Sequence, residues 1–250
     1  MTPRRRVLLD LDGTLVDRQS AFERWAERLI ASVRGDEEDL AWLIAEDAEG
    51  YRPRRELADA ITARLPAGGR PERLERQLQL GVIESIACYE GVVEGLRRLR
   101  DAGVELVLVT NGTVRQQTAK LERTGLDAQL DRVVISEEIG VKKPDPRIFA
   151  AALDGVAADP GTWMVGDHPS ADVGGARAAG LSTAWVSHGR PWPHTWRPTL
   201  SATTTAEILR SLARRACEVA GGVDERSDPA LTASPAPPLS PHRERGPRAR

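Results

Sequence analysis

The sequence predicts an α/β fold in which a doubly wound parallel sheet carries a helical domain inserted after its first strand. Short runs rich in Val, Leu and Ile alternate with amphipathic stretches, as expected when crossover helices join parallel strands. The runs are apolar on both faces, which is typical of strands covered by helices on both sides of a sheet. One stretch, residues 18–88, interrupts the alternation because it contains no convincing strand.

Five strands and four helices are expected in the regular part of the chain. The strands are predicted at 6–12, 104–111, 132–136, 162–167 and 182–187. The helices are predicted at 92–102, 114–124, 146–153 and 170–179. Gly103, Gly125 and Gly180 directly follow three of these helices, where a left-handed residue commonly ends a helix.

The interrupting stretch, residues 18–88, has the pattern of four amphipathic helices. Their sequences are SAFERWAERLIASV, EDLAWLIAEDAE, RRELADAITARL and ERLERQLQLGVIESI, and Gly35, Pro53 and PAGGRP separate them. We therefore divide the chain into an α/β domain (1–17 and 89–218), a helical domain (18–88) and a tail (219–250). The tail is dominated by Pro, Ser, Arg and Gly, which bury too little apolar surface to offset the entropy of ordering, so we expect it to be disordered.

Composition and charge exclude several classes of function. The 250 residues carry a net charge of -2, so no overall field favours nucleic acid or a membrane surface. No apolar stretch approaches the roughly 20 residues that span a bilayer, and the run after Arg6 is too short for a signal peptide. Cys88 and Cys217 lack the spacing of a metal site, and a few reduced thiols suit a reducing compartment. We expect a soluble cytoplasmic protein, and the sequence leaves its oligomeric state open.

Polar residues stand where the predicted strands end. They are Asp10 and Asp12 after the first strand, Thr110, Asn111 and Gly112 after the second, and Gly166, Asp167 and His168, followed by Asp172, after the fourth. In open parallel sheets, ligands bind outside the carboxyl ends of the strands. We therefore expect these polar groups in one crevice, together with Lys143, which follows the third strand.

Four motifs, DLDGTL, VTNG, GVKKPDPRIF and VGDHPSAD, occur in the order found in the haloacid dehalogenase-like hydrolase superfamily, which the sequence resembles over roughly residues 6–210. The resemblance implies a Rossmann-like sheet, and it relates the helical insert to the C1 cap of subfamily I. The last two motifs look most like those of phosphatases that act on small molecules and nucleotides. The implied activity is magnesium-dependent hydrolysis of a small phosphomonoester through an aspartyl-phosphate.

The resemblance gives the two acids of the first motif different roles. Asp10 is the nucleophile, because a carboxylate can form an aspartyl-phosphate. Asp12 is the general acid and base, and residues two apart on a strand point to the same side. Lys143, rather than its neighbour Lys142, is expected to neutralise Asp10 and a phosphate oxygen.

The remaining motif residues are expected to bind phosphate and metal. The Thr110 hydroxyl and the Asn111 and Gly112 amides would hold phosphate oxygens, next to a helix N-terminus that favours anions. The resemblance implies that Asp10, the backbone carbonyl of Asp12 and Asp167 bind Mg²⁺, with Asp172 acting through water or orienting the other ligands. Mg²⁺ prefers such hard oxygen ligands.

Asp12 also bears on the class of reaction. Dehalogenases of this superfamily have no aspartate at the corresponding position, since a leaving halide needs no proton. Two alternatives to a phosphatase stay open: a phosphomutase acting on a sugar phosphate, and a non-catalytic protein that uses the fold for binding or regulation. The sequence has no GxxxxGK[ST] loop, which argues against an ATP-hydrolysing motor.

The motifs do not define the substrate, which is expected to be a nucleotide, a sugar phosphate or a carboxylated phosphoester. A cap that closes over the crevice would contact the leaving group. The candidate contacts are Gln19, Phe22, Arg52, Arg54 and Arg55. The three arginines flank Pro53 and are suited to a second phosphate or a carboxylate. His168 is expected near the metal, with no required role.

Overall fold

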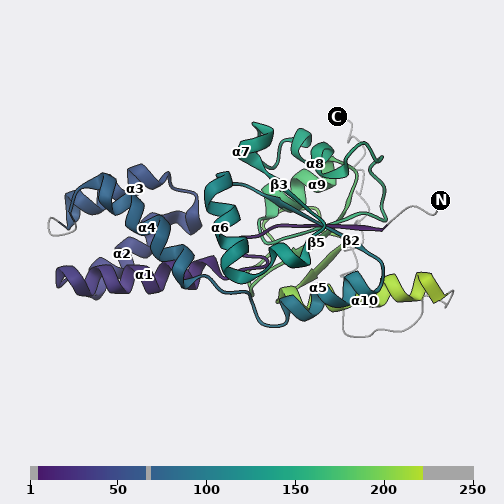
Figure 1. The fold of residues 1–250 in the computed structure, drawn as a ribbon, viewed down its shortest axis with the longest axis horizontal. Coiled ribbons are helices and arrows are strands. Elements are labelled where there is room, and N and C mark those ends of the chain that lie inside the picture. The colour runs from purple at the N-terminus through teal and green to yellow at the C-terminus, as the bar shows by residue number, and fades with distance from the viewer. Residues whose placement is uncertain (1–4, 66–68, 222–250) are drawn as a thin grey trace, which may run out of the picture.

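The computed structural model describes residues 5–65 and 69–221, and its six strands form one parallel sheet (Figure 1). The strands are β1 (Arg6–Leu9), β2 (Glu105–Thr110), β3 (Arg132–Ile135), β4 (Trp163–Gly166), β5 (Ser182–Val186) and β6 (Leu200–Ala202). Their order across the sheet is β3-β2-β1-β4-β5-β6, and every neighbouring pair is parallel. The predicted α/β fold with a doubly wound parallel sheet is confirmed.

Helices cover both faces of the sheet. The helices α5 (Val92–Asp101) and α10 (Thr205–Gly221) pack on one face, and α8 (Pro146–Leu153) and α9 (Gly175–Ala178) pack on the other (Figure 1). Successive strand residues alternate between the faces: Leu8 joins the apolar cluster of Phe149, and Leu9 joins that of Leu209. This period of two explains why the strands are apolar throughout.

The other helices of the α/β part lie near the carboxyl edge of the sheet or connect strands. They are α6 (Val114–Thr124), a 3₁₀ turn (Asp127–Gln129), α7 (Ser136–Ile139) and a π-helical turn (Pro169–Gly174). α6 begins at the Thr113 cap, whose side chain accepts from the Gln116 amide, and it ends at Gly125 with a φ of 68°. These caps hold the helix that follows β2 in a fixed position beside the strand ends.

Four helices between β1 and β2 confirm the helical pattern of residues 18–88. They are α1 (Arg18–Val33), α2 (Glu37–Asp47), α3 (Arg54–Arg64) and α4 (Pro71–Ser85), which pack together beside the sheet (Figure 1); a short 3₁₀ turn, η1 (Ala48–Gly50), follows α2. The chain leaves and re-enters the sheet along paired segments, because the Asp17 amide donates to Ala87 O at 2.9 Å and the Tyr89 amide donates to Leu15 O at 3.1 Å. The division into domains stays a prediction.

The structure corrects several predicted boundaries. β1 ends at Leu9 rather than at residue 12, and the helix predicted at 170–179 is a π-helical turn followed by the short α9. β6, α7 and α10 were not expected. The predicted start of the tail at 219 is wrong, because α10 continues to Gly221; its apolar residues Ile208 and Leu212 are buried at helical spacing. The rest of the predicted tail, 222–250, lies outside the described residues.

The cysteines and the apolar character of the helices are the last two features of the fold. Cys88 and Cys217 are free thiols, as expected. Within residues 5–65 and 69–221, no helix combines the length and the apolar character needed to cross a membrane.

The contact between α1 and α4 yields a test of the helical packing. A Cβ at Gly81 would lie 2.2 Å from Trp25 Cδ1, so the indole sits directly on the backbone of α4. Gly81→Ala should therefore destabilise the protein by about 1–3 kcal/mol through overpacking, although alanine is the better helix former. Urea denaturation should show this loss, whereas Arg76→Ala on the exposed side of α4 should change stability by less than about 0.5 kcal/mol. A Gly81→Ala protein as stable as wild type would contradict the packing.

Candidate active site

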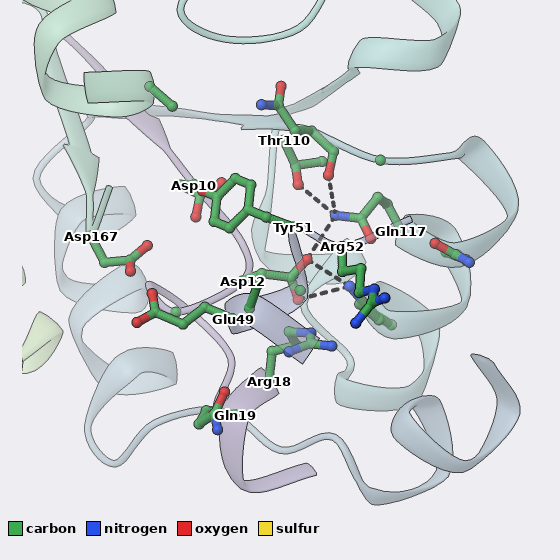
Figure 2. A pocket seen from close by; sticks show the side chains of 18 of the residues that line it. Asp10, Asp12, Arg18, Gln19, Glu49, Tyr51, Arg52, Thr110, Gln117 and Asp167 are labelled. Atoms are coloured by element: carbon green, nitrogen blue, oxygen red, sulfur yellow. Dashed lines mark hydrogen bonds and ion pairs between the residues drawn. The ribbon is translucent and has the colours of Figure 1, made fainter. Parts of the chain in front are cut away.

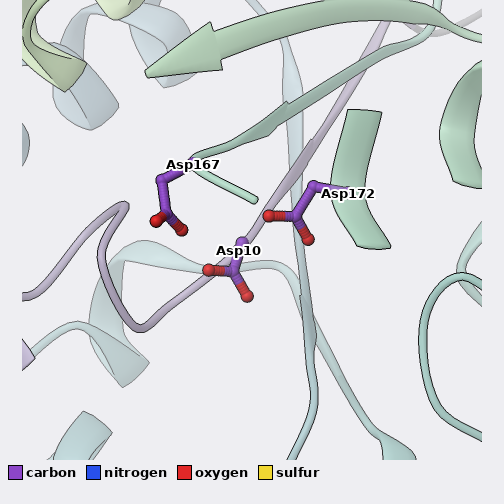
Figure 3. Close-up of side chains that lie close together, drawn as sticks. All are labelled: Asp10, Asp167 and Asp172. Atoms are coloured by element: carbon purple, nitrogen blue, oxygen red, sulfur yellow. The ribbon is translucent and has the colours of Figure 1, made fainter. Parts of the chain in front are cut away.

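Three carboxylates converge at the carboxyl edge of the sheet. Asp10 follows β1, Asp167 follows β4, and Asp172 lies in the π-helical turn (Figure 3). One ligand oxygen from each lies within 4.8 Å of the other two. β1 and β4 are adjacent and in register, with the Asp10 amide donating to Val165 O at 2.9 Å, so the sheet itself brings these acids together.

The turn after β1 depends on Gly13. Its φ is +78°, a conformation that side chains with a Cβ rarely adopt. A Cβ at this position would also lie 2.8 Å from the Asp167 carboxylate. Only glycine therefore allows the chain after Asp10 and Asp12 to pass this close to Asp167.

Lys143 joins the carboxylates, as predicted. Its Nζ lies 2.6 Å from Asp10 Oδ1 and 2.7 Å from Asp172 Oδ1, and it donates to Val109 O at 2.6 Å. Burial lowers the pKa of Lys143, but the two carboxylates outweigh burial and hold it above its usual value. Lys142 is exposed, so the geometry selects Lys143 of the two neighbouring lysines.

Arg190, on the loop after β5, is the second cation of the cluster. It donates from Nη2 to Asp167 Oδ2 at 3.0 Å and to Asp167 O at 3.0 Å. Lys143 and Arg190 supply two positive charges against three carboxylates, so one negative charge remains. Burial, reinforced by the neighbouring carboxylates, raises the pKa of both Asp10 and Asp167.

The carboxylate cluster fits a divalent cation. Its donors are hard oxygens, they come from three separate segments, and their charge is not balanced by the protein alone. Asp10, Asp167 and Asp172 are thus the residues that would hold Mg²⁺, and a bound cation would offset the negative charge that they share. Asp172 was expected only through water or as an orienting residue; it is buried, with Oδ2 accepting from the His168 amide at 3.0 Å.

Asp12 lies beside this cluster but has partners of its own. Lys120 Nζ lies 2.7 Å from Asp12 Oδ1 and 2.6 Å from Oδ2, and Gln117 Nε2 donates to Oδ2 at 3.2 Å (Figure 2). Burial raises the pKa of Asp12, but Lys120 and Gln117 more than compensate, so it lies below the usual value. Asp12 is therefore ionised at neutral pH in this arrangement.

The residues at the end of β2 and just after it line the crevice but are already hydrogen-bonded. The Thr110 hydroxyl accepts from Gln117 Nε2 at 2.5 Å, and the Gly112 amide donates to Ser136 Oγ at 2.9 Å. The Asn111 side chain accepts from the Lys143 amide at 2.8 Å and donates to Lys143 O at 3.1 Å. Asn111 thus holds the loop that carries Lys143, and the predicted phosphate contacts of the three residues stay predictions.

We call the helices α1 to α4, with the turn η1, the helical unit. A cavity of about 1540 Å³ lies between the helical unit and the carboxyl edge of the sheet. The catalytic candidates line it, as do Gln19, Arg52 and Arg54 of the predicted cap contacts. Phe22 does not belong to it, because its ring is fully buried against Trp25. Arg55 does not belong to it either, because it points outward and pairs with Glu72 at 2.8 Å.

The turn after α2 brings two more residues to the cavity. Glu49 Oε2 lies 3.5 Å from Arg190 Nη1, which links this turn to Asp167 through one guanidinium. The Tyr51 ring stands in front of Asp10 (Figure 2) and meets His168 edge-on, with 5.1 Å between ring centroids. His168 itself caps the π-helical turn, since its Nδ1 accepts from the Ala171 amide at 2.9 Å.

The sequence analysis did not predict that Lys120, Gln117 and Arg190 lie at the site. For Gln117 and Lys120 the sequence does contain an indication. They are three residues apart on the helix that follows Thr110–Asn111–Gly112, so they share one face of that helix. Both are buried polar residues, with 7% and 1% exposure. Arg190 lies in a loop of irregular structure, and no spacing relates it to Asp167.

The chain is similar in sequence to a family of hydrolases and to individual phosphatases. The family model of the haloacid dehalogenase-like hydrolases matches residues 5–180. Phosphoserine phosphatase from Thermus thermophilus is 42% identical over 128 residues, which are 49% of this chain and 51% of that protein, so the chain matches about half of its length. Glyceraldehyde 3-phosphate phosphatase from Methanopyrus kandleri is 31% identical over 203 residues, 74% of this chain and 85% of that protein.

Dehalogenases and solved structures are also similar to the chain. (S)-2-haloacid dehalogenase 4A from Burkholderia cepacia is 27% identical over 208 residues, 78% of this chain and 88% of that protein. The structure of YfnB from Bacillus subtilis, solved bound to magnesium, superposes with a TM-score of 0.66 at 23% identity and covers 84% of this chain and 98% of that one. At this identity the structural match shows the fold alone.

The carboxylate cluster predicts that magnesium stabilises the protein without any substrate. A ligand at 100 times its Kd adds about 2.7 kcal/mol, which should raise Tm by several degrees in a chain of this size. The rise should vanish in Asp167→Asn and persist in Asp101→Asn, whose side chain is exposed at the end of α5. Thermal unfolding with and without MgCl₂ measures both, and an undiminished rise in Asp167→Asn would place the cation elsewhere.

Proposed function

The chain belongs to the haloacid dehalogenase-like hydrolase family, and we propose that within it the protein is a magnesium-dependent phosphatase acting on a small phosphomonoester. The observation that carries this proposal is the pair Asp10 and Asp12 in one crevice, each with its own cation. A halide leaves without a proton, so a dehalogenase needs no acid at the position of Asp12. An alkoxide leaving group does need one.

In the first step, the Asp10 carboxylate attacks phosphorus. A bond forms between Asp10 oxygen and phosphorus, the bond from phosphorus to the leaving oxygen breaks, and Asp12 delivers a proton to that oxygen. In the second step, Asp12 takes a proton from water, the water oxygen bonds to phosphorus, and the bond to Asp10 breaks. The products are an alcohol and inorganic phosphate, and both acids are restored.

The surrounding residues reduce the repulsion between phosphate and carboxylates. Lys143 contacts Asp10 directly and has a raised pKa, so it remains charged throughout. Arg190 holds Asp167 in place. Asp10, Asp167 and Asp172 would hold Mg²⁺, which would supply further positive charge to offset the phosphate. The helix α6 begins beside Thr110–Gly112, and its N-terminus favours the transferring oxygens.

The contact with Lys120 suits Asp12 to the second step more than to the first. An ion pair stabilises the carboxylate, which is the form that accepts a proton from water. A phosphate dianion entering the crevice raises the pKa of Asp12, because a nearby negative charge disfavours its ionisation. We therefore expect Asp12 to take up a proton from solvent when substrate binds, and this protonation to loosen its contact with Lys120.

The named relatives support a small phosphorylated substrate. Phosphoserine phosphatase and glyceraldehyde 3-phosphate phosphatase both carry names of enzymes that act on small phosphate esters. The cavity is also suited to such a ligand, because it lies at the carboxyl edge of the sheet and is closed on one side by the helical unit. We propose that the helical unit acts as the cap that encloses the leaving group.

Replacing the nucleophile tests this mechanism. Asp10→Asn should abolish phosphate release from p-nitrophenyl phosphate, because an amide is a far poorer nucleophile than a carboxylate. Asp101→Asn should release phosphate at the wild-type rate, and circular dichroism should show both variants folded. A folded Asp10→Asn protein with wild-type turnover would refute the mechanism.

The activity of the wild-type protein distinguishes the two alternative functions. A protein that isomerises sugar phosphates without releasing phosphate would be a mutase. A protein without either activity would be the binding or regulatory alternative.

Replacing Lys120 tests whether its ion pair with Asp12 contributes to turnover. Lys120→Met removes the ammonium but keeps the stem, so Asp12 loses the group that orients both of its oxygens. The variant should hydrolyse p-nitrophenyl phosphate with a kcat about 10-fold below wild type and should accumulate phosphorylated enzyme, because the second step needs the Asp12 carboxylate that Lys120 stabilises. General acid–base groups contribute about 10²–10⁴-fold, so this loss is partial. A folded Lys120→Met protein with wild-type kcat and no added phosphorylated enzyme would mean that Lys120 supports only the fold.

A further inference from the structure

Two guanidinium groups share one buried carboxylate on the cavity side of the helical unit. Asp47, at the end of α2, has no exposed surface. Arg18 forms a bidentate pair with it, and Arg54 Nη1 lies 2.6 Å from Asp47 Oδ1. Two positive charges therefore face one negative charge. An ion pair of this kind is costly to bury unless a further anion completes it.

The neighbouring arginines are balanced, unlike Arg54. Arg52 pairs with Glu46, and Arg55 pairs with Glu72 and Asp59 on the outer side of α3. The acids Glu23, Glu49 and Glu75 also line the cavity, but none of them forms an ion pair with Arg54 in the described part of the chain. The uncompensated charge thus belongs to the Arg18–Asp47–Arg54 group.

Arg54 is held in place and still has hydrogen-bond donors to offer. Its Nη1 donates to Asp47 and its Nη2 donates to Gly50 O at 3.0 Å, which uses two of the five N–H groups of a guanidinium. Gly50 has a φ of +93°, and a Cβ there would lie 2.9 Å from Arg18 Cζ, so the backbone packs tightly on the arginines. The Arg54 side chain is 19% exposed, compared with 7% for Arg18. Arg54 is therefore the member that a ligand can reach.

Arg54 also faces the reaction centre. Arg54, Arg18 and Asp12 line the same cavity, and the positive charge of Arg18 acts on Asp12. Burial and the Arg18 charge lower the pKa of Arg54, and Asp12 acts on it in the opposite direction, as charges within electrostatic reach do. A molecule whose phosphate lies at Asp10 would place the far end of its leaving group on this side of the cavity.

We propose that Arg54, held by Asp47 and Arg18, binds a second anionic group of the substrate, so that the enzyme prefers phosphomonoesters that also carry a carboxylate or another phosphate. This inference rests on the proposed phosphatase activity and adds its substrate class. A guanidinium fork matches the oxygens of either anion in two parallel hydrogen bonds. Its fixed position means that little entropy is lost when the anion binds.

Matched substrate pairs test the proposal. The carboxylate arm compares 3-phosphoglycerate with glycerol 3-phosphate, and the phosphate arm compares ribulose 1,5-bisphosphate with ribulose 5-phosphate. Wild-type kcat/KM should be higher for the anion-bearing member of at least one pair, and the arm with the preference identifies the anion. In Arg54→Gln this preference should fall by about 10- to 150-fold, the change expected when a hydrogen bond to a charged group is lost.

Two further variants control for folding and for general charge. Arg55→Gln, outside the cavity, should leave the preference within about twofold of wild type. Arg54→Lys keeps the charge beside Asp47 but lacks the fork, so it should fold and lose several-fold of the preference even where Arg54→Gln is unstable. Equal losses by the Arg54 variants on both members of a pair would overturn the proposal, as would a wild-type enzyme without any preference. Absence of turnover on every phosphoester, including p-nitrophenyl phosphate, would refute the phosphatase activity itself.

Discussion

Electrostatic repulsion among Asp10, Asp167 and Asp172 is the constraint on which the rest of the site depends. Three carboxylates cannot gather at a buried sheet edge unless positive charge accompanies them. Lys143 supplies one charge by contacting Asp10 and Asp172, and Arg190 supplies another at Asp167. The charge left over makes the site receptive to a divalent cation, which would reduce the repulsion of a phosphate dianion. Buried carboxylates with raised pKa values, such as Asp10 and Asp167, are common at functional sites.

The parallel sheet brings the carboxylates and their cations together because the carboxyl ends of all its strands lie at one edge. β1 and β4 are neighbours, so Asp10 and Asp167 meet without any long connection, and Asn111 ties the Lys143 loop to the end of β2. The helical unit lies on the other side of the cavity and contributes Arg18, Asp47 and Arg54, in which two positive charges face one negative charge. In the proposed function, phosphate chemistry belongs to the sheet side of the cavity and recognition of the leaving group to the helical side.

Much of this arrangement could be predicted from the sequence, because it rests on local patterns. Asp10, Asp167 and Lys143 each follow an apolar strand, and the rule that ligands bind at strand ends brings them together. The cations Arg190 and Lys120 could not be paired with their acids in this way, since contacts between distant elements depend on the packing of the whole domain. Short β6 lacks a run of apolar residues, with the sequence Leu-Ser-Ala, and its strand geometry comes from pairing with β5. Phe22 was misplaced because an aromatic residue on an amphipathic helix has the same pattern whether it faces a cavity or a core.

The proposed mechanism requires Asp10 to become phosphorylated during turnover, and peptide mass spectrometry can detect this intermediate. Wild-type protein is mixed with p-nitrophenyl phosphate and MgCl₂, quenched in acid during steady state and digested with pepsin at low pH, where acyl phosphates survive. We expect one added phosphoryl group on Asp10, absent before substrate is added and lost once substrate is exhausted. Active protein that carries no phosphoryl group at any time after mixing, or carries it on a residue other than Asp10, would rule out this mechanism.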